Sequence, residues 1–410
     1  MRILHTSDWH LGQNFFTKSR KNEHLAFIKW LLQLVEQQSI DAVIVAGDVF
    51  DTGAPPSYAR EMYNQFVVDL NRQGCQLVVL GGNHDSVSTL NESKQLLACL
   101  NTHVIANTSE ALDEQIIELK SGAEVGAYLC AVPFVRARDV VSSQAGESGV
   151  QKQQALGKAI EQHYHALYQR ACELREQHKH NVPIIATGHL TALGVTATES
   201  VRDIYIGTLD GFDAKGFPAA DYIALGHIHR PQIVAKKQHI RYSGSPIPLS
   251  FDELKSEKQV VVAEFENGQL KEITPVPVPR FQAMQSLKGD LASIESQLKA
   301  LADENQQQTV WVSVEVQVQD FLSDLQNRIQ LLVEDTTIEV LQLRRSRESY
   351  SVALKQSNNE TLAELTPFDV FSKRLDLEQF EGDAEQQRRT RITQTFKQIV
   401  SDIEDQEPTQ

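Results

Sequence analysis

The sequence lacks the features that would direct it to a membrane or an oxidising compartment. No apolar run approaches the roughly 20 residues that a membrane-spanning helix needs. The chain opens with a strand-like run, Arg2 to Thr6, without the charged start and apolar stretch of a signal peptide. Its four cysteines are isolated and form no CxxC pair that would indicate zinc binding or redox chemistry. These absences predict a soluble, cytoplasmic protein with free thiols and no membrane attachment.

Basic residues are also in short supply. The 39 Lys and Arg residues are outnumbered by 54 Asp and Glu residues, which gives a formal net charge of -15. A protein that holds nucleic acid by broad electrostatic attraction usually has a basic surface. Any contact with DNA is therefore expected to be local or supported by partners. Bound divalent cations would offset part of the negative charge.

Up to about residue 250, short apolar runs alternate with amphipathic stretches, which is the pattern of an α/β layered domain. The clearest predicted helix is Asn22 to Gln37, where apolar residues recur at helical spacing. Asn267 and Gly268 predict a hairpin turn, and the proline-studded Pro275 to Pro279 predicts a stiff connector. The predicted strands are Arg2 to Thr6, Ala42 to Ala46, Gln76 to Leu80, Ala127 to Val132, Pro183 to Thr187 and Tyr222 to Leu225.

A second, smaller α/β unit is predicted after the connector. It has helices over Asp290 to Glu304 and Phe321 to Val333, and strands over Thr309 to Val318 and Ile338 to Leu343. A polar stretch and further helices follow, the first of them signalled by Thr366-Pro367. The predicted organisation is a main domain over residues 1–278, a small domain over 279–346, a linker over 347–360, a helical segment over 361–403 and an acidic tail over 404–410.

Five apolar strands are each followed at once by residues that bind hard or borderline metals. The segments are Ser7 to His10, Gly47-Asp48, Gly81 to Asp85, Gly188-His189 and Gly226 to His229. Strand ends in an α/β sheet converge on one edge, where ligand and catalytic sites tend to form. Glycine in four of these segments lets the backbone approach a metal closely. A lone histidine or aspartate is most often structural, but five such segments in order favour one shared site.

The candidate ligands offer carboxylate, amide and imidazole groups and no thiolate, a set that suits manganese, iron or zinc. They are Asp8, His10, Asp48, Asn83, His189, His227 and His229. Seven ligands are too many for one tetrahedral zinc ion. They suit two ions that share a bridging carboxylate, at the roughly 3.5 to 4 Å separation of two-metal hydrolases. The sequence therefore predicts a pair of divalent cations.

The order Asp-x-His, Gly-Asp, Gly-Asn-His-Asp, Gly-His and Gly-His-x-His resembles that of the calcineurin-like metallophosphoesterases. The stretches His5 to Gly12, Ala46 to Asp51 and Tyr242 to Ser250 are similar to the DNA nucleases of that superfamily that work with a coiled-coil ATPase. The likeness runs almost end to end and is strongest through about residue 255. It implies a layered fold of central β-sheets flanked by helices, with a small capping domain and C-terminal helices.

The resemblance also implies a division of the ligands and the roles of neighbouring residues. One metal would be held by Asp8, His10, Asp48 and His229, and the other by Asp48, Asn83, His189 and His227, with manganese as the supporting ion. The implied catalytic residue is His84, which acts on the phosphate and does not bind metal. Asp85 has two interpretations: it orients the His84 imidazole, or it has a structural role in the turn.

The metal site alone would serve equally well in a free-standing small-molecule phosphodiesterase or phosphatase. The resemblance favours a manganese-dependent DNA exonuclease and endonuclease that acts on DNA ends and hairpins in repair, replication and recombination. Lys18, Arg20 and Lys21 either contact the DNA backbone or form a plain solvated loop.

Two protein partners are implied as well. The C-terminal helices, with Ile392, Phe396, Ile399 and Val400 on one face, would bind the coiled-coil ATPase or else dock on their own domain. A homodimer would form through helices over Ser57 to Asn71 and Thr89 to Leu100, whose apolar residues equally suit a core.

Overall fold

The structure is a computed structural model that describes residues 1–140, 149–201, 211–317 and 322–345, together with residues 371, 375, 388, 389, 391–393, 395 and 396. The chain divides into two compact units, Met1–Arg345 and Ser346–Gln410. The predicted linker and acidic tail lie outside the described residues, and of the segment 361–403 only single residues are described. Within the described part of the chain, no helix has the length and apolar character needed to cross a membrane.

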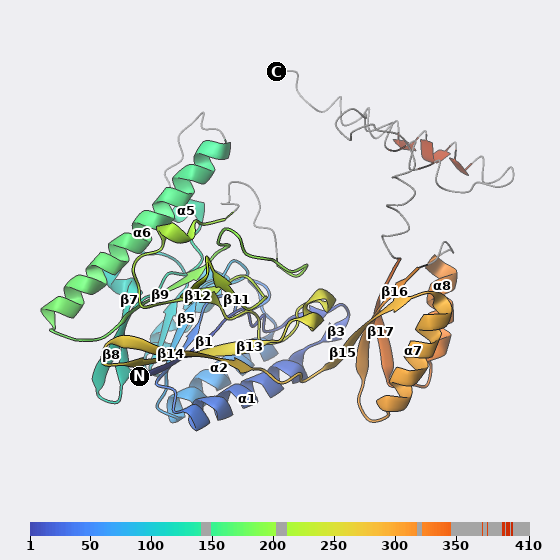
Figure 1. Ribbon diagram of the computed structural model, residues 1–410, viewed down its shortest axis with the longest axis horizontal. Coiled ribbons are helices and arrows are strands. Elements are labelled where there is room, and N and C mark those ends of the chain that lie inside the picture. The colour runs from blue at the N-terminus through green and yellow to red at the C-terminus, as the bar shows by residue number, and fades with distance from the viewer. Residues whose placement is uncertain are drawn as a thin grey trace, which may run out of the picture. The chain divides into compact units, whose positions relative to one another are not determined.

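Two six-stranded sheets form the centre of the first unit (Figure 1). Across the first sheet the order is β14 (Gln269–Pro277), β13 (Gln259–Glu266), β1 (Arg2–Thr6), β4 (Ala42–Val45), β5 (Gln76–Leu80) and β6 (Thr102–Ile105). Across the second it is β11 (Gln232–Val234), β12 (Lys237–Tyr242), β10 (Tyr222–Gly226), β9 (Ile184–His189), β8 (Glu124–Cys130) and β7 (Ile116–Ser121). Strands β1, β4, β5 and β6 are parallel, as are β8, β9, β10 and β12. Each parallel set therefore ends on one edge of its sheet.

Alternating side chains on the strands build three apolar layers. Between the two sheets lies a core that includes Ile3, Ile44, Val78, Leu129, Ile185 and Tyr222. The opposite face of the first sheet packs against α1 (Lys21–Gln38) and α2 (Ser57–Arg72), and the opposite face of the second packs against α6 (Gly149–Gln177). The expected α/β architecture of central sheets flanked by helices is confirmed.

Short elements connect these layers. They are β2 (Asn14–Phe15), β3 (Lys18–Ser19), α3 (Val87–Asn91), α4 (Lys94–Ala98), α5 (Ala137–Val140), and the 3-10 helices η1 (Leu112–Gln115), η2 (Ala214–Gly216) and η3 (Phe251–Lys255). The single helix expected over Thr89 to Leu100 is wrong, because the chain forms α3 and α4 instead. The break falls at Glu92 and Ser93, beside Asn91. Asn and Ser form helices poorly.

The β13–β14 hairpin shows one confirmed expectation and one correction. Asn267 and Gly268 have φ angles of 54° and 78°, as the predicted tight turn requires. The connector expected over Pro275 to Pro279 is wrong in its first half, because β14 extends to Pro277 and pairs with β13. β14 is an edge strand of the sheet, which is the position where a strand tolerates prolines without an N–H donor.

A small parallel sheet, β15 (Ala283–Gly289), β16 (Val310–Val316) and β17 (Ile338–Arg345), follows with helices α7 (Leu291–Glu304) and α8 (Leu322–Val333). Asp290 caps α7, since its side chain accepts a 2.8 Å hydrogen bond from the Ser293 N–H. This sheet contacts the β2–β3 hairpin, where the Phe15 ring stacks on Trp311 with centroids 5.7 Å apart. Strand β15 was not predicted. The domain limits stay a prediction, since the small sheet belongs to the same compact unit as the main sheets.

Candidate metal centre

The five predicted segments lie at the carboxyl ends of neighbouring parallel strands. Asp8 and His10 follow β1, Asp48 follows β4, and Asn83 follows β5 in the first sheet. In the second sheet, His189 ends β9, while His227 and His229 follow β10. Because the two sheets face each other, these strand ends bring residues more than 200 positions apart into contact. The backbone N–H of His227, for example, donates a 2.9 Å hydrogen bond to the Asp8 carboxylate.

Glycines allow the chain segments to come this close. A Cβ added to Gly47 would lie 2.1 Å from Nδ1 of His189, and one added to Gly82 would lie 2.1 Å from Oδ1 of Asp48. The backbone itself is strained at several candidate ligands. Non-glycine residues rarely adopt positive φ angles, yet such angles occur at Asp8 (55°), His10 (48°), Asp48 (51°) and His227 (93°). Strain of this kind clusters at functional sites, where the surrounding structure maintains it.

Potential ligand atoms gather in three overlapping groups whose atoms lie within 4.8 Å of one another. The groups are Asp8 with His10 and His229, His10 with Asp48 and His84, and Asp48 with His189 and His227. Asn83 joins the third group, since its Oδ1 lies 3.0 Å from Nε2 of His189 and 2.9 Å from Nδ1 of His227. All seven predicted ligands are thus brought together, and Asp48 lies between the two ends of the cluster.

The orientation of the imidazoles fits bound cations. Nδ1 of His189 contacts the Ala46 carbonyl at 2.9 Å, which leaves Nε2 directed at Asp48 Oδ2, 3.2 Å away. Nδ1 of His10 contacts the Asp51 carboxylate at 3.2 Å. Nε2 of His10 is buried without a hydrogen-bond partner and lies 3.7 Å from Asp48 Oδ2. A buried ring nitrogen beside a carboxylate is costly unless it has a partner, and a divalent cation is such a partner.

Electrostatics around Asp48 point the same way. Burial opposes ionisation of the Asp48 carboxyl, but the neighbouring imidazoles, His189 first, hold its pKa well below the usual range. Burial likewise opposes the charged form of His189, but the Asp48 carboxylate outweighs it and raises the pKa of His189 to about 9. Burial, with a contribution from His189, lowers the pKa of His227 to about 3. The buried carboxylate therefore requires a positive charge next to it, and metal binding would displace the proton from His189.

His84 lies at the edge of this cluster and is half-buried. Its backbone N–H donates a 2.9 Å hydrogen bond to Asp48 Oδ1, and its ring stands edge-on to His10 with centroids 4.7 Å apart. Nδ1 of His84 contacts the Asp51 carbonyl at 2.8 Å. This contact and the backbone hydrogen bond hold the ring beside the cluster.

The suggested orienting role of Asp85 is wrong, and its structural role in the turn is the one observed. Its buried carboxylate accepts hydrogen bonds from the backbone N–H groups of Gly82, Val49 and Phe50 at 2.9, 3.1 and 3.0 Å. These bonds join the loops that follow β4 and β5. Burial, and then the charge of Asp48, raises the pKa of Asp85 to about 6.

The loop with Lys18, Arg20 and Lys21 was expected either to contact DNA or to be solvated, and Arg20 does neither. Arg20 is completely buried, forms an ion pair with Glu23 at 2.6 Å and donates to the Pro248 carbonyl, so it cannot contact DNA. Lys18 forms an ion pair with Glu339 of the small sheet at 2.7 Å. Lys18 thus links the loop to the small sheet, and the guanidinium of Arg20 lies over the Phe15 ring, 5.1 Å from its centroid.

Sequence reasoning missed several residues that support the site. Asp51 contacts two imidazoles, and Ser7 donates a 2.5 Å hydrogen bond to Asp8 Oδ2. Both stand within three residues of a predicted ligand, and this proximity in sequence could have indicated that they support the site. Ser200 and Glu253, which lie behind His229, stand outside the five metal-binding segments, although Glu253 follows the stretch Tyr242 to Ser250 by three residues. His5 is buried, and its Nδ1 lies 2.9 Å from the Tyr222 hydroxyl.

Comparison with known proteins assigns the chain to a class. Residues 1–231 match the family model described as calcineurin-like phosphoesterase, and residues 280–379 match one described as type 5 capsule protein repressor C-terminal domain. The fold and the site thus define a metallophosphoesterase, a hydrolase that uses divalent metal ions. The metal candidates gathered at the strand ends are consistent with this class.

Individual relatives narrow the class further. The SbcD component of the nuclease SbcCD in Escherichia coli K12 is 52% identical over 98% of this chain and 100% of its own length. The corresponding SbcD protein of Bacillus subtilis is 33% identical over 79% of this chain and 81% of its own. The SbcD protein of Rhodobacter capsulatus is 33% identical over 68% of this chain and 70% of its own. The chain therefore belongs to the SbcD family of metal-dependent nucleases.

Proposed function

We propose that this chain is a manganese-dependent DNA exonuclease and endonuclease that works with an SbcC-like coiled-coil ATPase. Its role would be the processing of DNA ends and hairpins during repair, replication and recombination. The observation that carries the proposal is the position of Asp48, shared between two groups of ligand atoms at the ends of the parallel strands. The names of the relatives, which describe a subunit of the nuclease SbcCD, support a nucleic acid substrate and assembly with a second subunit.

The proposed ligand sets divide the cluster in two. Asp8, His10, Asp48 and His229 would hold one ion, and Asp48, Asn83, His189 and His227 would hold the other. The mixture of oxygen and imidazole ligands, without thiolate, suits manganese. When bound, the two ions would supply Lewis-acid activation of a water molecule and neutralise charge on the phosphate.

His84 is proposed to act on the phosphate itself. Its Nδ1 contact with the Asp51 carbonyl and the bond from its backbone N–H to Asp48 fix the ring beside the cluster. A protonated Nε2 would then donate a hydrogen bond or a proton to the leaving or nonbridging oxygen. The residue is not fully buried, so a substrate can approach it.

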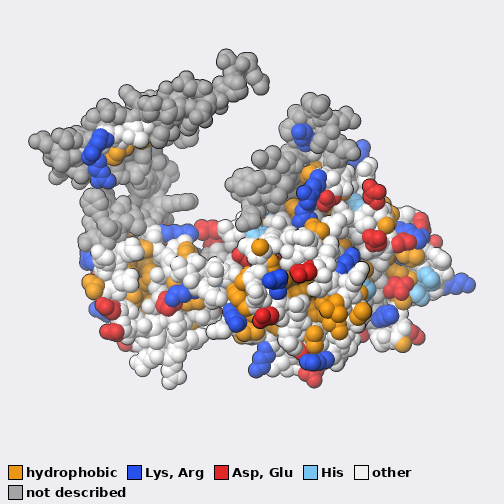
Figure 2. Space-filling model, turned by 180° about the vertical axis from the view of Figure 1, so that it is seen from behind, with side chains coloured by type: hydrophobic (Ala, Val, Ile, Leu, Met, Phe, Trp, Pro, Cys, Tyr) orange, Lys and Arg blue, Asp and Glu red, His pale blue; other side chains and the backbone are white. Residues whose placement is uncertain are grey.

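On the face drawn in Figure 2, basic and acidic side chains of the described residues are interspersed. This face is not broadly basic, in line with the net charge of -15, so the contact with DNA is proposed to be local to the metal centre. A free-standing small-molecule phosphodiesterase or phosphatase is the alternative, because the metal site itself does not select the substrate.

One comparison of substrates separates the two functions. Purified protein with Mn²⁺ is offered linear duplex DNA, hairpin DNA, a cyclic nucleotide and a generic phosphodiester, each with and without the coiled-coil ATPase and ATP. We expect manganese-dependent cleavage of both DNA substrates, with the ATPase and ATP increasing it. Hydrolysis of the cyclic nucleotide with no DNA cleavage in any arm would establish the alternative.

The C-terminal helices are the proposed docking site for the ATPase. In the second unit, the Phe371 and Phe396 rings stack at 3.8 Å, and Ile392 lies beside them in an apolar pocket. Ile399 and Val400 lie outside the described residues. An apolar helix face of this kind is suited to a partner helix.

Phe396→Asp should therefore remove binding of the ATPase and the stimulation by ATP, while manganese-dependent cleavage of simple substrates persists. An unpaired charge buried in an apolar interface costs several kcal/mol, on the order of a thousandfold in affinity. Phe396→Leu is the matched control and should retain the complex. Co-purification measures both variants. A Phe396→Asp protein that still forms the complex would show that the docking site lies elsewhere.

A homodimer through the nuclease domain is also proposed. Its contact surface is narrower than the two helical segments, Ser57 to Asn71 and Thr89 to Leu100, that the sequence suggested. The apolar residues of α2, including Met62, Phe66 and Leu70, are buried against α1 and the first sheet. On α4, by contrast, Leu96 is 65% exposed. The proposed contact therefore involves α4 and its surroundings.

A further inference from the structure

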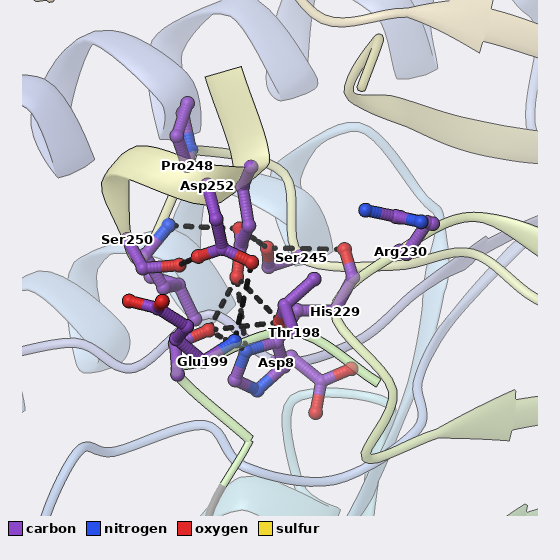
Figure 3. Close-up of polar contacts among 12 residues, drawn as sticks. Asp8, Thr198, Glu199, His229, Arg230, Ser245, Pro248, Ser250 and Asp252 are labelled. Carbon is purple, nitrogen blue, oxygen red and sulfur yellow. Dashed lines mark hydrogen bonds and ion pairs between the residues drawn. The ribbon is translucent and has the colours of Figure 1, made fainter. Parts of the chain in front are cut away.

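Behind the metal-centre residue His229 lies a buried polar cluster that the proposed chemistry does not use (Figure 3). At its centre is the carboxylate of Glu253, on η3, which has no exposed surface. Lys258, also buried, donates to Glu253 Oε2 at 2.5 Å, to the hydroxyl of Ser245 at 2.8 Å and to the carbonyl oxygen of His229 at 2.9 Å. All three protons of its ammonium group are thus used. The Lys258–Glu253 ion pair is therefore fully hydrogen-bonded within the cluster, and through Lys258 it holds the backbone carbonyl of His229 in place.

The side chain of His229 is held by the same cluster. Its Nδ1 lies 2.6 Å from the Ser200 hydroxyl, and that hydroxyl in turn contacts Glu253 Oε1. A hydroxyl has a single proton. Ser200 donates this proton to the carboxylate, which can only accept, and therefore accepts from Nδ1–H of His229. This order of donors fixes the tautomer of the imidazole and leaves the Nε2 lone pair for the group formed with Asp8 and His10.

Glu253 has its remaining acceptor positions filled, which explains how a buried carboxylate can be maintained here. Oε1 also accepts from the Thr198 hydroxyl at 2.9 Å, and Oε2 accepts from the Leu249 N–H at 2.9 Å. Its charge is balanced by Lys258. The Glu253 carboxylate is thus fully hydrogen-bonded and charge-balanced. Its contact with Ser200 can therefore orient the His229 imidazole.

We propose that Ser200 and Glu253 are positioning residues that hold the His229 imidazole in its Nδ1–H tautomer, with Nε2 directed at the cation of the Asp8 and His10 group. The inference rests on the proposed two-metal function and assigns a role in it to residues outside every motif. Hydrogen bonds to the second nitrogen of a ligating histidine orient the ring and raise its basicity. Losing one typically lowers metal affinity by about 10 to 100-fold.

The loop that carries Ser200 is attached at two further points. The Glu199 N–H donates to the Asp252 carboxylate at 3.2 Å, next to Glu253. The Glu199 side chain forms an ion pair with Arg344 of β17 at 3.0 Å. The positioning residues are therefore supported by η3 and by the small sheet. The small sheet is thus connected to the ligand His229 through Arg344, Glu199 and Ser200.

The test is the variant Ser200→Ala, which removes one hydroxyl. Calorimetric titration of the full chain with Mn²⁺ measures the affinity of each metal site. We expect one of the two ions to bind about 10 to 100-fold more weakly and the other to bind as in the wild type. Ser200→Thr keeps the hydroxyl and should restore the affinity. Ser293→Ala is the matched control, because the exposed Ser293 hydroxyl contacts Gln297 on α7 and its loss should leave both affinities unchanged. Thermal unfolding in a chelator measures the fold of each variant.

The possible results separate this inference from the proposed function. A wild-type chain that binds no pair of ions overturns the two-metal function itself. Two wild-type sites that are both unchanged in Ser200→Ala overturn only the positioning role. Loss of both sites or of the fold in Ser200→Ala also overturns it, since Ser200 would then be general structural support.

Discussion

Asp48→Ala should lose nuclease activity to the background level. Asp48 belongs to two of the three ligand groups, and its carboxylate lies 3.2 Å from Nε2 of His189 and 3.7 Å from Nε2 of His10. Its removal would therefore take a ligand from both ions at once. The loss should exceed the roughly 10² to 10³-fold that follows removal of a single transition-state hydrogen-bond donor.

Two measurements and two controls define this prediction. Cleavage of linear duplex DNA with Mn²⁺ measures the activity, and elemental analysis of the loaded protein measures bound manganese, which should fall as well. Asp48→Asn keeps the size of the side chain and an oxygen for the His84 N–H, and tests the charge alone. Asp69→Ala removes a carboxylate from the surface of α2 and should leave activity unchanged. Near-normal cleavage by Asp48→Ala at modest manganese would refute the bridging assignment.

His84→Ala should lower the rate of cleavage by about 10² to 10⁴-fold while both ions remain bound, because general acid-base groups contribute this much. The proposed ligand sets do not include His84, and its fixed contacts are to the Asp51 carbonyl and to Asp48. Single-turnover cleavage measures the rate and elemental analysis measures the metal. His165→Ala, on the exposed side of α6, is the matched control. If His84→Ala loses manganese in proportion to its activity, His84 is a ligand.

The gathering of the candidate ligands at the strand ends was the most predictable feature of the molecule. Parallel strands end on a common edge, so ligand residues placed directly after a strand are brought together whatever their separation in sequence. This rule placed Asp8 with His227 from residue types alone. In the structure, the two-residue period of β1 places Ile3 in the core between the two sheets and Leu4 in the core under α1 and α2.

What could not be predicted depends on the direction of individual side chains. The sequence placed Asp85 next to His84, but the carboxylate turns to the backbone N–H groups of two loops. Arg20 stands in a basic stretch and is nevertheless buried, where its guanidinium pairs with Glu23 and donates to the Pro248 carbonyl. The contact of Ser200 with Glu253 joins two loops that have no motif and no regular period, so only the folded chain reveals it.

Titration of the purified chain with Mn²⁺, followed by electron paramagnetic resonance, tests the central claim most directly. Two ions that share a carboxylate at the roughly 3.5 to 4 Å separation of two-metal hydrolases interact magnetically. We expect two manganese ions per chain and the spectrum of an exchange-coupled pair, which Asp48→Ala should abolish. A single bound ion, or two ions with uncoupled spectra, would contradict the shared position of Asp48 and the two-metal site built on it.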